Sequence, residues 1–415
     1  MHLLHRISKR HALITILAAS LATLGVIGGL GIAKPLESDA VYFTAIAQNL
    51  IEQGTYANPR SPWPTAPAVD RLPGWTSFIA LGLFSFRGIP APVVVRLLSA
   101  FLNILAAWLL SRLTFRLTRN EPAALLAGVS FSFYLPALYV AQSALSEPGF
   151  ICLLLLGVSD LASRKFMRAS FLLGMGSLFR ANILLILPGL ALYLFWQLKG
   201  EPRMRKILLI VAALLLFAIP PAAWILRNAW AANCFPVLST TSGEVIRGSY
   251  NPVVARGELW GYWVFPNEIP GEIPFQDLAR KMSQCEVNRY YQSEARSFAR
   301  DNLSLMPSMV LGRLFRSYVP IPIKVSLTSI LGFGNRWLLY LAFFLTLGFW
   351  KRRLPAEYAW ILLMFFSVSL VTTIVMVGNS RHVLWMEVLL FPPAACGLFG
   401  WLQSKSAHQI GTHQN

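Results

Sequence analysis

The sequence predicts an all-α polytopic membrane protein, and two observations carry that prediction. Of its 415 residues, 55% are hydrophobic and only 13% are charged, against roughly 25% charged in an ordinary soluble domain. Apolar runs long enough for membrane helices recur along most of the chain, and short clusters of Lys and Arg separate them. Mean hydropathy is +0.55, so the bilayer is the expected solvent for most of the helices.

The basic clusters set the expected topology. Lys and Arg number 36 against 18 Asp and Glu, which gives a formal net charge of +18. Short loops with such clusters face the cytoplasm in membrane proteins. We therefore expect five loops on that side, at 6–10, 112–119, 164–168, 199–206 and 351–353. No basic, aromatic-rich soluble domain accompanies the charge, so membrane lipids are expected partners and nucleic acid is not.

With every basic cluster inside, the chain has about ten membrane-spanning helices. The expected spans are residues 12–33, 92–113, 121–141, 148–163, two helices within 169–197, then 206–226, 335–350, 356–377 and 383–403. The run 74–86 is shorter than the roughly 20 residues that a hydrocarbon core requires. We expect it to lie in the interface, although the alternative, in which it also spans, stays open.

Two substantial segments fall on the outer side, at 35–91 and 227–334. The first has a helical pattern from Asp39 to Gln53 with Gly54 as its stop signal. The second has a polar helix at 275–302 and an amphipathic stretch at 304–318. Both are expected to lie on the membrane as caps. We therefore divide the chain into a main module with these external loops, residues 1–334, and C-terminal transmembrane helices, residues 335–415.

The chain has four cysteines and shows no metal-binding spacing. Cys152 and Cys396 lie in apolar runs and behave as small hydrophobic residues. Cys234 and Cys285 fall in the second external segment, where a disulfide forms only in an oxidising compartment, and the sequence leaves their pairing open. Without a CxxC or His-rich cluster, neither a metal nor a cofactor is expected.

Ionisable side chains at the outer rim of the membrane are costly and are therefore functional candidates. An acid in such a set can serve as a general base, and arginines can hold a phosphate through paired hydrogen bonds. The rim thus predicts a site for attack on an anionic ligand. Its members are Glu37, Asp39, Asp70, Arg71, Glu147, Arg180, Arg227, Arg247 and Arg381.

The acids among these candidates also have a structural interpretation. Glu37, Ser38 and Asp39 precede a helix, where short polar side chains cap free N–H groups and acids favour the helix dipole. Ser146 and Glu147 precede another helix, with a proline in its first turn. Local physics does not separate capping from catalysis at either place.

The arginines among the candidates likewise have both a structural and a functional interpretation. Arg71 is an interfacial anchor in one interpretation, with its guanidinium reaching the lipid headgroups, and Arg381 is a loop charge. Arg180 lies in an apolar run, where an unpaired cation is expensive, so it requires an acidic partner or a ligand phosphate.

The order of short motifs then becomes informative. The first apolar run is followed by Asp39 with Tyr42 and Gly54-Thr55-Tyr56, and then by Arg71-Leu72-Pro73-Gly74 at the start of an apolar helix. Further along come Leu145-Ser146-Glu147-Pro148, Gly176-Ser177-Leu178-Phe179-Arg180, Trp224-Ile225-Leu226-Arg227-Asn228 and Ser380-Arg381-His382. This order resembles the GT-C glycosyltransferases that use polyprenyl-phosphate sugars, in particular the protein O-mannosyltransferase and aminoarabinose transferase branch.

The resemblance implies a GT-C-like bundle and assigns roles to the rim residues. Asp39 is the expected catalytic base and Glu147 a second catalytic acid, and the expected substrate-binding residues are Glu37, Tyr42, Arg71, Arg180 and Arg381. Many relatives carry two adjacent acids in the first loop, whereas this chain has Ser38-Asp39 with Glu37 two positions before Asp39. The family's Arg-Pro-Pro is replaced by Arg71-Leu72-Pro73.

The resemblance also implies the reaction. The donor is a polyprenyl-phosphate sugar, the acceptor is a lipid, glycan or protein, and transfer inverts the anomeric centre on the extracytoplasmic face. A bacterial inner membrane is the expected location, and the branch is generally metal-independent.

Two other function classes remain open. A lipid-linked sugar flippase is also basic, polytopic and arginine-lined, but it places its charges in a central cavity reached from both faces. An O-antigen ligase or polymerase is an enzyme of related logic whose key residues lie mainly in one late loop. Here the candidates gather on one side and begin in an early loop, which favours the glycosyltransferase.

Overall fold

The structure is a computed structural model of the chain, and it describes residues 8–235, 238–319, 327–350 and 355–399. Regular structure in these residues is helical, and the only β pairing is an isolated bridge between Ala57 and Pro67. The all-α prediction is therefore confirmed. The basic cluster at 351–353, the residues before position 8 and the end of the last expected span lie outside the described residues.

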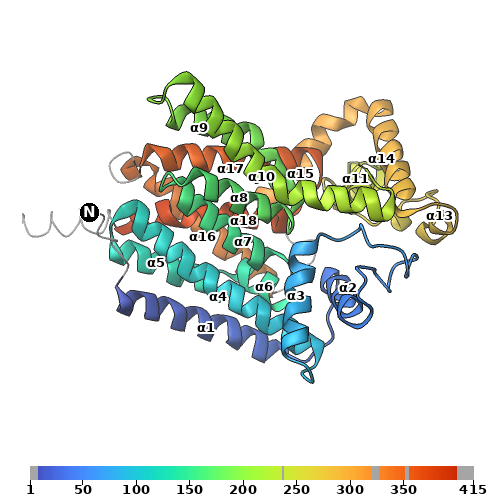
Figure 1. Cartoon of the computed structure of the whole chain (residues 1–415), viewed down its shortest axis with the longest axis horizontal. Helices are drawn as coiled ribbons and strands as arrows, with labels where there is room; N and C mark the ends of the chain where they lie inside the picture. Colours follow the sequence, from blue (N-terminus) through green and yellow to red (C-terminus); the bar gives the residue numbers. More distant parts are fainter. Residues whose placement is uncertain (1–7, 236–237, 320–326, 351–354, 400–415) are drawn as a thin grey trace, which may run out of the picture.

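Mostly apolar helices that lie side by side form the bundle (Figure 1). They are α1 (Lys9–Leu30), α4 (Ala91–Thr118), α5 (Glu121–Ser132), α6 (Leu135–Gln142), α7 (Glu147–Leu161), α8 (Phe166–Ser177), α9 (Leu187–Gln197), α10 (Arg203–Ala232), α16 (Leu327–Trp350), α17 (Ala356–Val375) and α18 (Leu384–Glu387). α1 packs on α4 and α5, α4 packs on α7, and α10 runs along α8. One continuous apolar core joins these elements.

Five segments in the described part of the chain are long and apolar enough to cross a membrane: α1, α4, α10, α17 and Ser380–Phe399. α5 and α6 bend by 49° at a short break and together form a sixth candidate. The chain is an integral membrane protein. α7, α8 and α9 are shorter than the roughly 20 residues of a full span, so the expected total of about ten spans stays a prediction.

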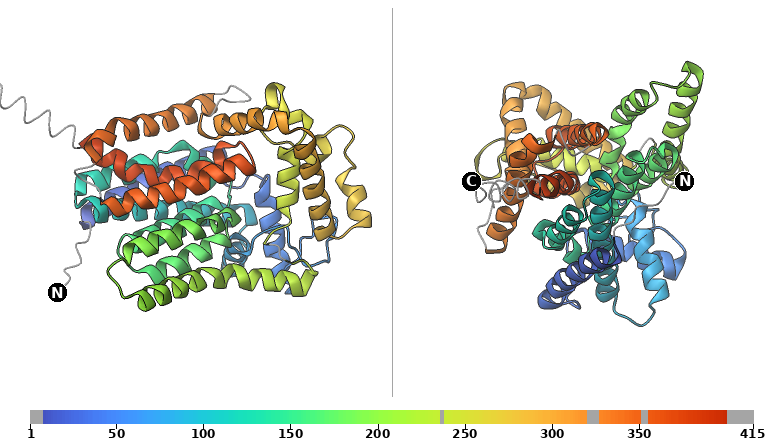
Figure 2. Two further views of the ribbon diagram at one scale, coloured as in Figure 1. Left: turned by 90° about the horizontal axis from the view of Figure 1, so that it is seen from above. Right: turned by 90° about the vertical axis from the view of Figure 1, so that its left-hand side faces the viewer.

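The remaining helices gather at one end of the bundle, on the right in both Figure 1 and the left view of Figure 2. They are α2 (Asp39–Gln53), α3 (Pro73–Ser85), α11 (Thr241–Ser249), α12 (Pro252–Ala255), α13 (Phe275–Lys281), α14 (Gln284–Asp301) and α15 (Met306–Tyr318). We call this group the cap. α3 runs across the bundle axis (Figure 1), which is the orientation of an interfacial helix.

Short 3₁₀ helices complete the fold. They are η1 (Ala181–Ile186), η2 (Gly257–Leu259), η3 (Pro266–Glu268), η4 (Leu303–Leu305), η5 (Ser380–Val383) and η6 (Val388–Leu390). Two local expectations are confirmed by these boundaries: α2 begins at Asp39 and ends before Gly54, and the apolar run 169–197 is broken just before Arg180. The polar helix expected at 275–302 is instead two helices, because Ser283 caps α14 and starts a new one.

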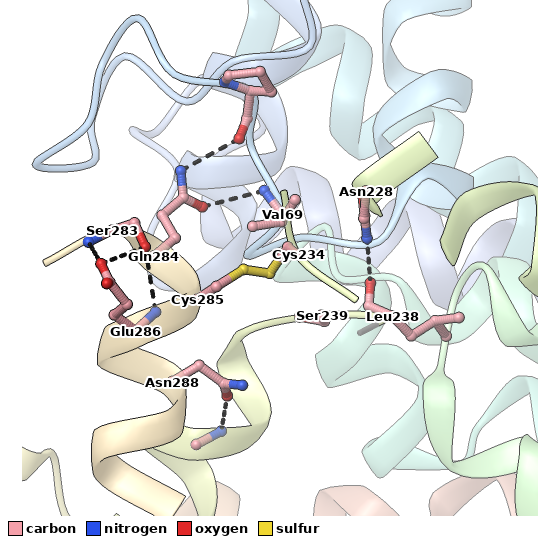
Figure 3. Close-up of a disulfide and its surroundings, with 12 residues drawn as sticks. Val69, Asn228, Cys234, Leu238, Ser239, Ser283, Gln284, Cys285, Glu286 and Asn288 are labelled. Carbon is pink, nitrogen blue, oxygen red and sulfur yellow. Dashed lines mark hydrogen bonds between the residues drawn. A yellow bond between two sulfur atoms is a disulfide. The ribbon is translucent and has the colours of Figure 1, made fainter. Parts of the chain in front are cut away.

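A disulfide between Cys234 and Cys285 fastens the cap to the end of α10 (Figure 3). Beside it, the Gln284 side chain accepts a hydrogen bond from the Val69 backbone N–H at 3.2 Å and donates to the Pro67 carbonyl at 3.3 Å. These contacts join α14 to the loop that leads from α2 to α3. The sequence left this pairing open, and the structure settles it.

Candidate active site

Five segments that are distant in the sequence bring charged side chains together where the bundle meets the cap. Asp39 is the first residue of α2, and Glu147 is the first residue of α7. Arg71 lies two residues before α3, Arg180 precedes η1, and Arg381 lies in η5. We call these five residues the acid–arginine cluster, and all five were predicted as site residues from the sequence.

Arg381 joins the two carboxylates. Its Nη1 donates to Oδ2 of Asp39 at 3.1 Å, and its Nε donates to Oε1 of Glu147. Its remaining nitrogen, Nη2, donates to no residue in the described part of the chain, and the side chain is one-quarter exposed. A bridging guanidinium with one free edge can therefore serve a ligand while it holds both acids.

Arg180 is the second partner of Glu147. Its Nη1 lies 2.7 Å from Oε1 of Glu147, and its Nη2 lies 2.6 Å from Nδ1 of His382. Because arginine can only donate, Nδ1 of His382 accepts, so the imidazole is neutral and its proton is on Nε2. The expectation that Arg180 requires a partner in its apolar surroundings is met by Glu147.

Arg71 holds the other side of Asp39. Its Nη2 lies 3.4 Å from Oδ1 of Asp39 and its Nη1 lies 3.9 Å from Oδ2 of Asp70. The guanidinium carbon is 4.9 Å from the centre of the Tyr42 ring, which is cation–π distance. Tyr42 therefore acts as a platform beneath Arg71 in this structure.

The two carboxylates differ sharply in exposure. The side chain of Asp39 is 36% exposed, whereas that of Glu147 is fully buried. Burial alone would raise the pKa of Asp39, but the positive charges of Arg71 and Arg381, together with the hydrogen bond from Arg381, outweigh it and hold that pKa below its ordinary value. Asp39 is thus an ionised carboxylate that an external molecule can reach.

One phenylalanine ring explains why the motifs that contain Arg71, Glu147 and Arg180 meet; we call it the phenylalanine wedge. The ring of Phe179, the residue before Arg180, lies against Gly74 of the Arg71 motif and Gly149 of the Glu147 motif. A Cβ at Gly74 would stand 2.4 Å from this ring, and one at Gly149 would stand 2.6 Å from it. The Gly74 N–H also donates to the Leu178 carbonyl at 2.9 Å. Only glycine fits at both contacts, so the three motifs can close around one ring.

The sequence suggested helix capping as a structural role for both acid motifs, but the structure does not show it. Ser38 and Ser146 occupy the N-cap positions of α2 and α7, and neither side chain makes a capping hydrogen bond. Asp39 and Glu147 both point to arginines instead. Glu37 is exposed and forms no ion pair with the described residues, so the structure does not bring it into the cluster.

Two other rim arginines serve the fold instead of the cluster. Arg227 donates to the Ala68 carbonyl at 2.7 Å and lies over the Tyr56 ring. Arg247 forms a buried ion pair with Glu272, with Nη2 2.5 Å from Oε2. The Arg227 contact ties α10 to the loop between α2 and α3, and the Arg247 contact ties parts of the cap together.

The sequence did not single out two neighbours of the cluster. His382 was visible only as the residue after Arg381. Glu244 lies three positions after Thr241 on α11, and Thr241 Oγ1 is 3.5 Å from Nη1 of Arg71, so Glu244 is on the helix face toward the cluster. Burial raises the pKa of Glu244, and Arg71 offsets this only in part. Nothing in the local sequence around Glu244 marks it as a site residue.

One buried arginine fixes the spacing of the two acid-bearing loops. Arg96 on α4 donates to the carbonyls of Ile32, Lys34 and Pro35 on one side and to that of Gln142 on the other. Asp39 follows the first group and Glu147 follows Gln142. The sequence contains Arg96 within an apolar span without any sign of this role.

Within the described residues, no group of three or more His, Cys, Asp or Glu side chains is arranged to hold a metal ion. The charged side chains of the cluster can do two things. Asp39 can accept a proton, and the arginines can bind an anion through charged hydrogen bonds.

Comparison with solved structures identifies proteins of similar fold. The apo oligosaccharyltransferase of Archaeoglobus fulgidus superposes with a TM-score of 0.56 at 13% identity, over 98% of this chain and 52% of that one. The archaeal oligosaccharyltransferase AglB from Archaeoglobus fulgidus, in complex with an inhibitory peptide and a dolichol-phosphate, gives a TM-score of 0.54 at 13% identity, over 97% of this chain and 52% of that one. The chain has a GT-C fold.

The GT-C fold was the expectation from the motif order, and it is confirmed. This chain spans about half the length of the archaeal proteins it superposes on. Searches with the sequence find no matching family model and no matching curated protein. The finer branch, protein O-mannosyltransferase or aminoarabinose transferase, stays a prediction, as does the division of the chain at residue 334.

Proposed function

We propose that this chain is a membrane glycosyltransferase that moves a sugar from a polyprenyl-phosphate donor to a hydroxyl of a lipid, glycan or protein acceptor. The observation that carries the proposal is the position of Asp39. It is a partly exposed, ionised carboxylate held between Arg71 and Arg381, at the end of a GT-C bundle where the cap begins. An acid beside paired cations suits attack on a phosphate-bearing donor.

Asp39 is the proposed general base. It accepts the proton of the acceptor hydroxyl as that oxygen forms a bond to the anomeric carbon. The bond from this carbon to the phosphate oxygen breaks on the opposite side, and its electron pair leaves with the polyprenyl phosphate. The configuration therefore inverts. Asp39 is suited to this role because its side chain is partly exposed, whereas that of Glu147 is sealed from solvent.

The arginines are proposed to stabilise the departing phosphate. Arg381 retains an N–H edge that no described residue uses, and the buried Nε of Arg71 has no hydrogen-bond partner among the described residues. Fixed cationic donors directed at developing charge each stabilise a transition state by several kcal/mol. Arg180 adds a third positive charge, and Tyr42 supports Arg71 from below.

Glu147 is proposed to line the site as the group that positions Arg180 and Arg381. Both arginines bond the same oxygen, Oε1, while Oε2 is buried without a partner in the described chain. Glu37 is exposed at the outer rim, and its role as a substrate-binding residue remains a proposal.

An isoprenoid path along α3 is part of the proposal. Leu81, Phe84 and Phe86 are each more than half exposed on or just after this interfacial helix. Exposed apolar side chains beside a membrane suit a polyprenyl tail. AglB, which superposes on this chain, was solved with a dolichol-phosphate and an inhibitory peptide, and this supports a lipid-phosphate donor and a peptide as one acceptor class.

The proposed location is a bacterial inner membrane, with the cluster facing the periplasm. The Cys234–Cys285 disulfide supports that orientation, because disulfides persist in oxidising compartments. It lies in the cap, on the same side as the cluster.

The test is a transfer reaction with the purified full chain in lipid nanodiscs. Polyprenyl-phosphate sugars with a labelled sugar are supplied together with an extract of bacterial membranes and periplasm as the acceptor source. The proposal expects release of polyprenyl phosphate that depends on protein and acceptor. Equilibration of intact donor across a vesicle membrane without phosphate release would instead support a flippase.

A further inference from the structure

A second charged feature lies at the opposite end of α7 and α8 from the acid–arginine cluster. α7 starts at Glu147 and ends at Leu161, a length of about 20 Å at the helical rise per residue. The turn that follows carries Arg164 and Lys165, and Arg168 lies in the first turn of α8. This feature is therefore remote from the proposed site of transfer.

These three cations line a cavity of about 480 Å³. The apolar part of its lining includes Phe166, Leu198 and Leu209, so the cavity lies between the α7–α8 turn and the α9–α10 turn. None of the described residues that line it is acidic. A cavity with cations at one edge and apolar walls suits a ligand that has an anionic head and an apolar body.

Local acids compensate this charge incompletely. Arg168 is paired with the buried Asp160, with Nε 2.5 Å from Oδ2. Arg164 lies 3.9 Å from Glu357 and is two-thirds exposed, so this contact is weak. Lys165 is exposed and forms no ion pair within the described residues. Arg164 and Lys165 are thus the cations left for a ligand.

Exposed apolar side chains flank the cavity. α9 projects from the bundle (Figure 1), and Leu192 and Phe195 on it are 68% and 59% exposed. On α10, Ile207 and Leu208 are 48% and 66% exposed. A cavity flanked by such surfaces opens toward acyl chains, whereas a site for a free inorganic anion would need no apolar flank.

We propose that this cavity is a binding site for an anionic phospholipid. The headgroup phosphate contacts Arg164 and Lys165, and the acyl chains pack on Leu198, Leu209 and the exposed apolar face of α9 and α10. Basic pockets between membrane helices bind anionic headgroups by this combination of charge and apolar contact. The inference is independent of the proposed transfer reaction, because no residue of the acid–arginine cluster takes part.

The test compares the thermal unfolding of the full chain in nanodiscs of phosphatidylcholine alone and with added phosphatidylglycerol. For the wild type, phosphatidylglycerol should raise Tm by a few degrees, because a ligand that binds only the folded state stabilises it. The double variant Arg164→Gln/Lys165→Gln should lose more than half of that rise. Its Tm in phosphatidylcholine alone reports whether it folds normally.

The matched control is Arg112→Gln/Arg119→Gln, which removes the same charge from exposed positions that belong neither to the cavity lining nor to residues 164–168 and 198–209. It should keep the full rise in Tm. An equal loss in both double variants would overturn the proposal in favour of general surface charge, and so would the absence of any rise in the wild type.

A second measurement uses only the wild type, in case the Arg164→Gln/Lys165→Gln variant fails to fold. A photoreactive phosphatidylglycerol should crosslink to peptides that contain residues 164–168 or 198–209, and excess phosphatidylglycerol should compete better than phosphatidylcholine. Crosslinks confined to other parts of the chain would contradict the site.

Discussion

Arg381 Nη1 lies 3.1 Å from Asp39 Oδ2, although 342 positions separate the two residues in the sequence. The same guanidinium also bonds Glu147 through Nε. One late arginine therefore connects the acid of the first external loop with the acid at the start of α7. The charge, the direction of two N–H groups and the planar shape of arginine are all used in this contact.

Replacing Arg381 by lysine tests whether that geometry matters. The ammonium keeps the positive charge but cannot direct separate N–H edges at Asp39, Glu147 and a phosphate. We expect kcat to fall by about 100-fold or more, the size of losing one donor to developing charge. Steady-state kinetics on the donor would check this, and an unchanged kcat in Arg381→Lys would exclude a bidentate role.

Glu147→Gln tests whether Glu147 is a scaffold for the arginines. Its side chain is fully buried, and the variant leaves Arg180 and Arg381 without their shared charge. Removing one partner of a buried ion pair typically costs about 3–5 kcal/mol, so we expect a large drop in Tm. Asp39→Asn, at a more exposed position, is the matched comparison and should lower Tm far less. Equal effects would remove the distinction between the two acids.

Gly149→Ala tests the wedge formed by Phe179. The added Cβ would stand 2.6 Å from the ring and must displace it, which costs about 1–3 kcal/mol in a packed interior. Because Arg180 is the next residue, transfer activity should fall together with stability. Gly28→Ala is the control, since a Cβ there meets nothing within 4 Å. Similar Tm values for the two variants would argue against a tight contact.

The pH dependence of kcat/KM should reflect the lowered pKa of Asp39. The ordinary pKa of an aspartate is 3.8, so Asp39 is ionised throughout the neutral range. The fall of kcat/KM at low pH, the acid limb of the profile, should therefore lie below pH 3.8. The matching stabilisation of the fold is complete above the unfolded pKa and is lost as pH falls through the lower folded pKa. In Arg71→Gln, burial is opposed by one fewer cation, so the acid limb should move to higher pH. An unmoved limb would assign it to another group.

Local features of the fold could be predicted from the sequence because short-range rules govern them. α2 begins at Asp39 and ends before Gly54 as its capping and stop signals indicate, and the break before Arg180 follows from a charged residue in an apolar run. The members of the acid–arginine cluster could be predicted from the sequence. Ionisable side chains are costly at a membrane and are therefore functional candidates, and the order of the short motifs points to the same five residues.

The partners within the cluster could not be predicted in this way. Nothing near Arg381 in the sequence specifies that it bridges Asp39 and Glu147, since that contact depends on how α2, α7 and η5 pack. The Arg96 clamp and the position of Glu244 have the same origin. The Cys234–Cys285 bond joins residues 51 positions apart, and sequence spacing alone does not select a pairing.

The most direct test of the account is the rate of sugar transfer by Asp39→Asn. Asparagine keeps the size of the side chain and removes the proton acceptor, so the rate should fall by about 100-fold or more, while binding of polyprenyl phosphate and Tm stay close to wild type. A variant that transfers sugar at the wild-type rate would contradict Asp39 as the base.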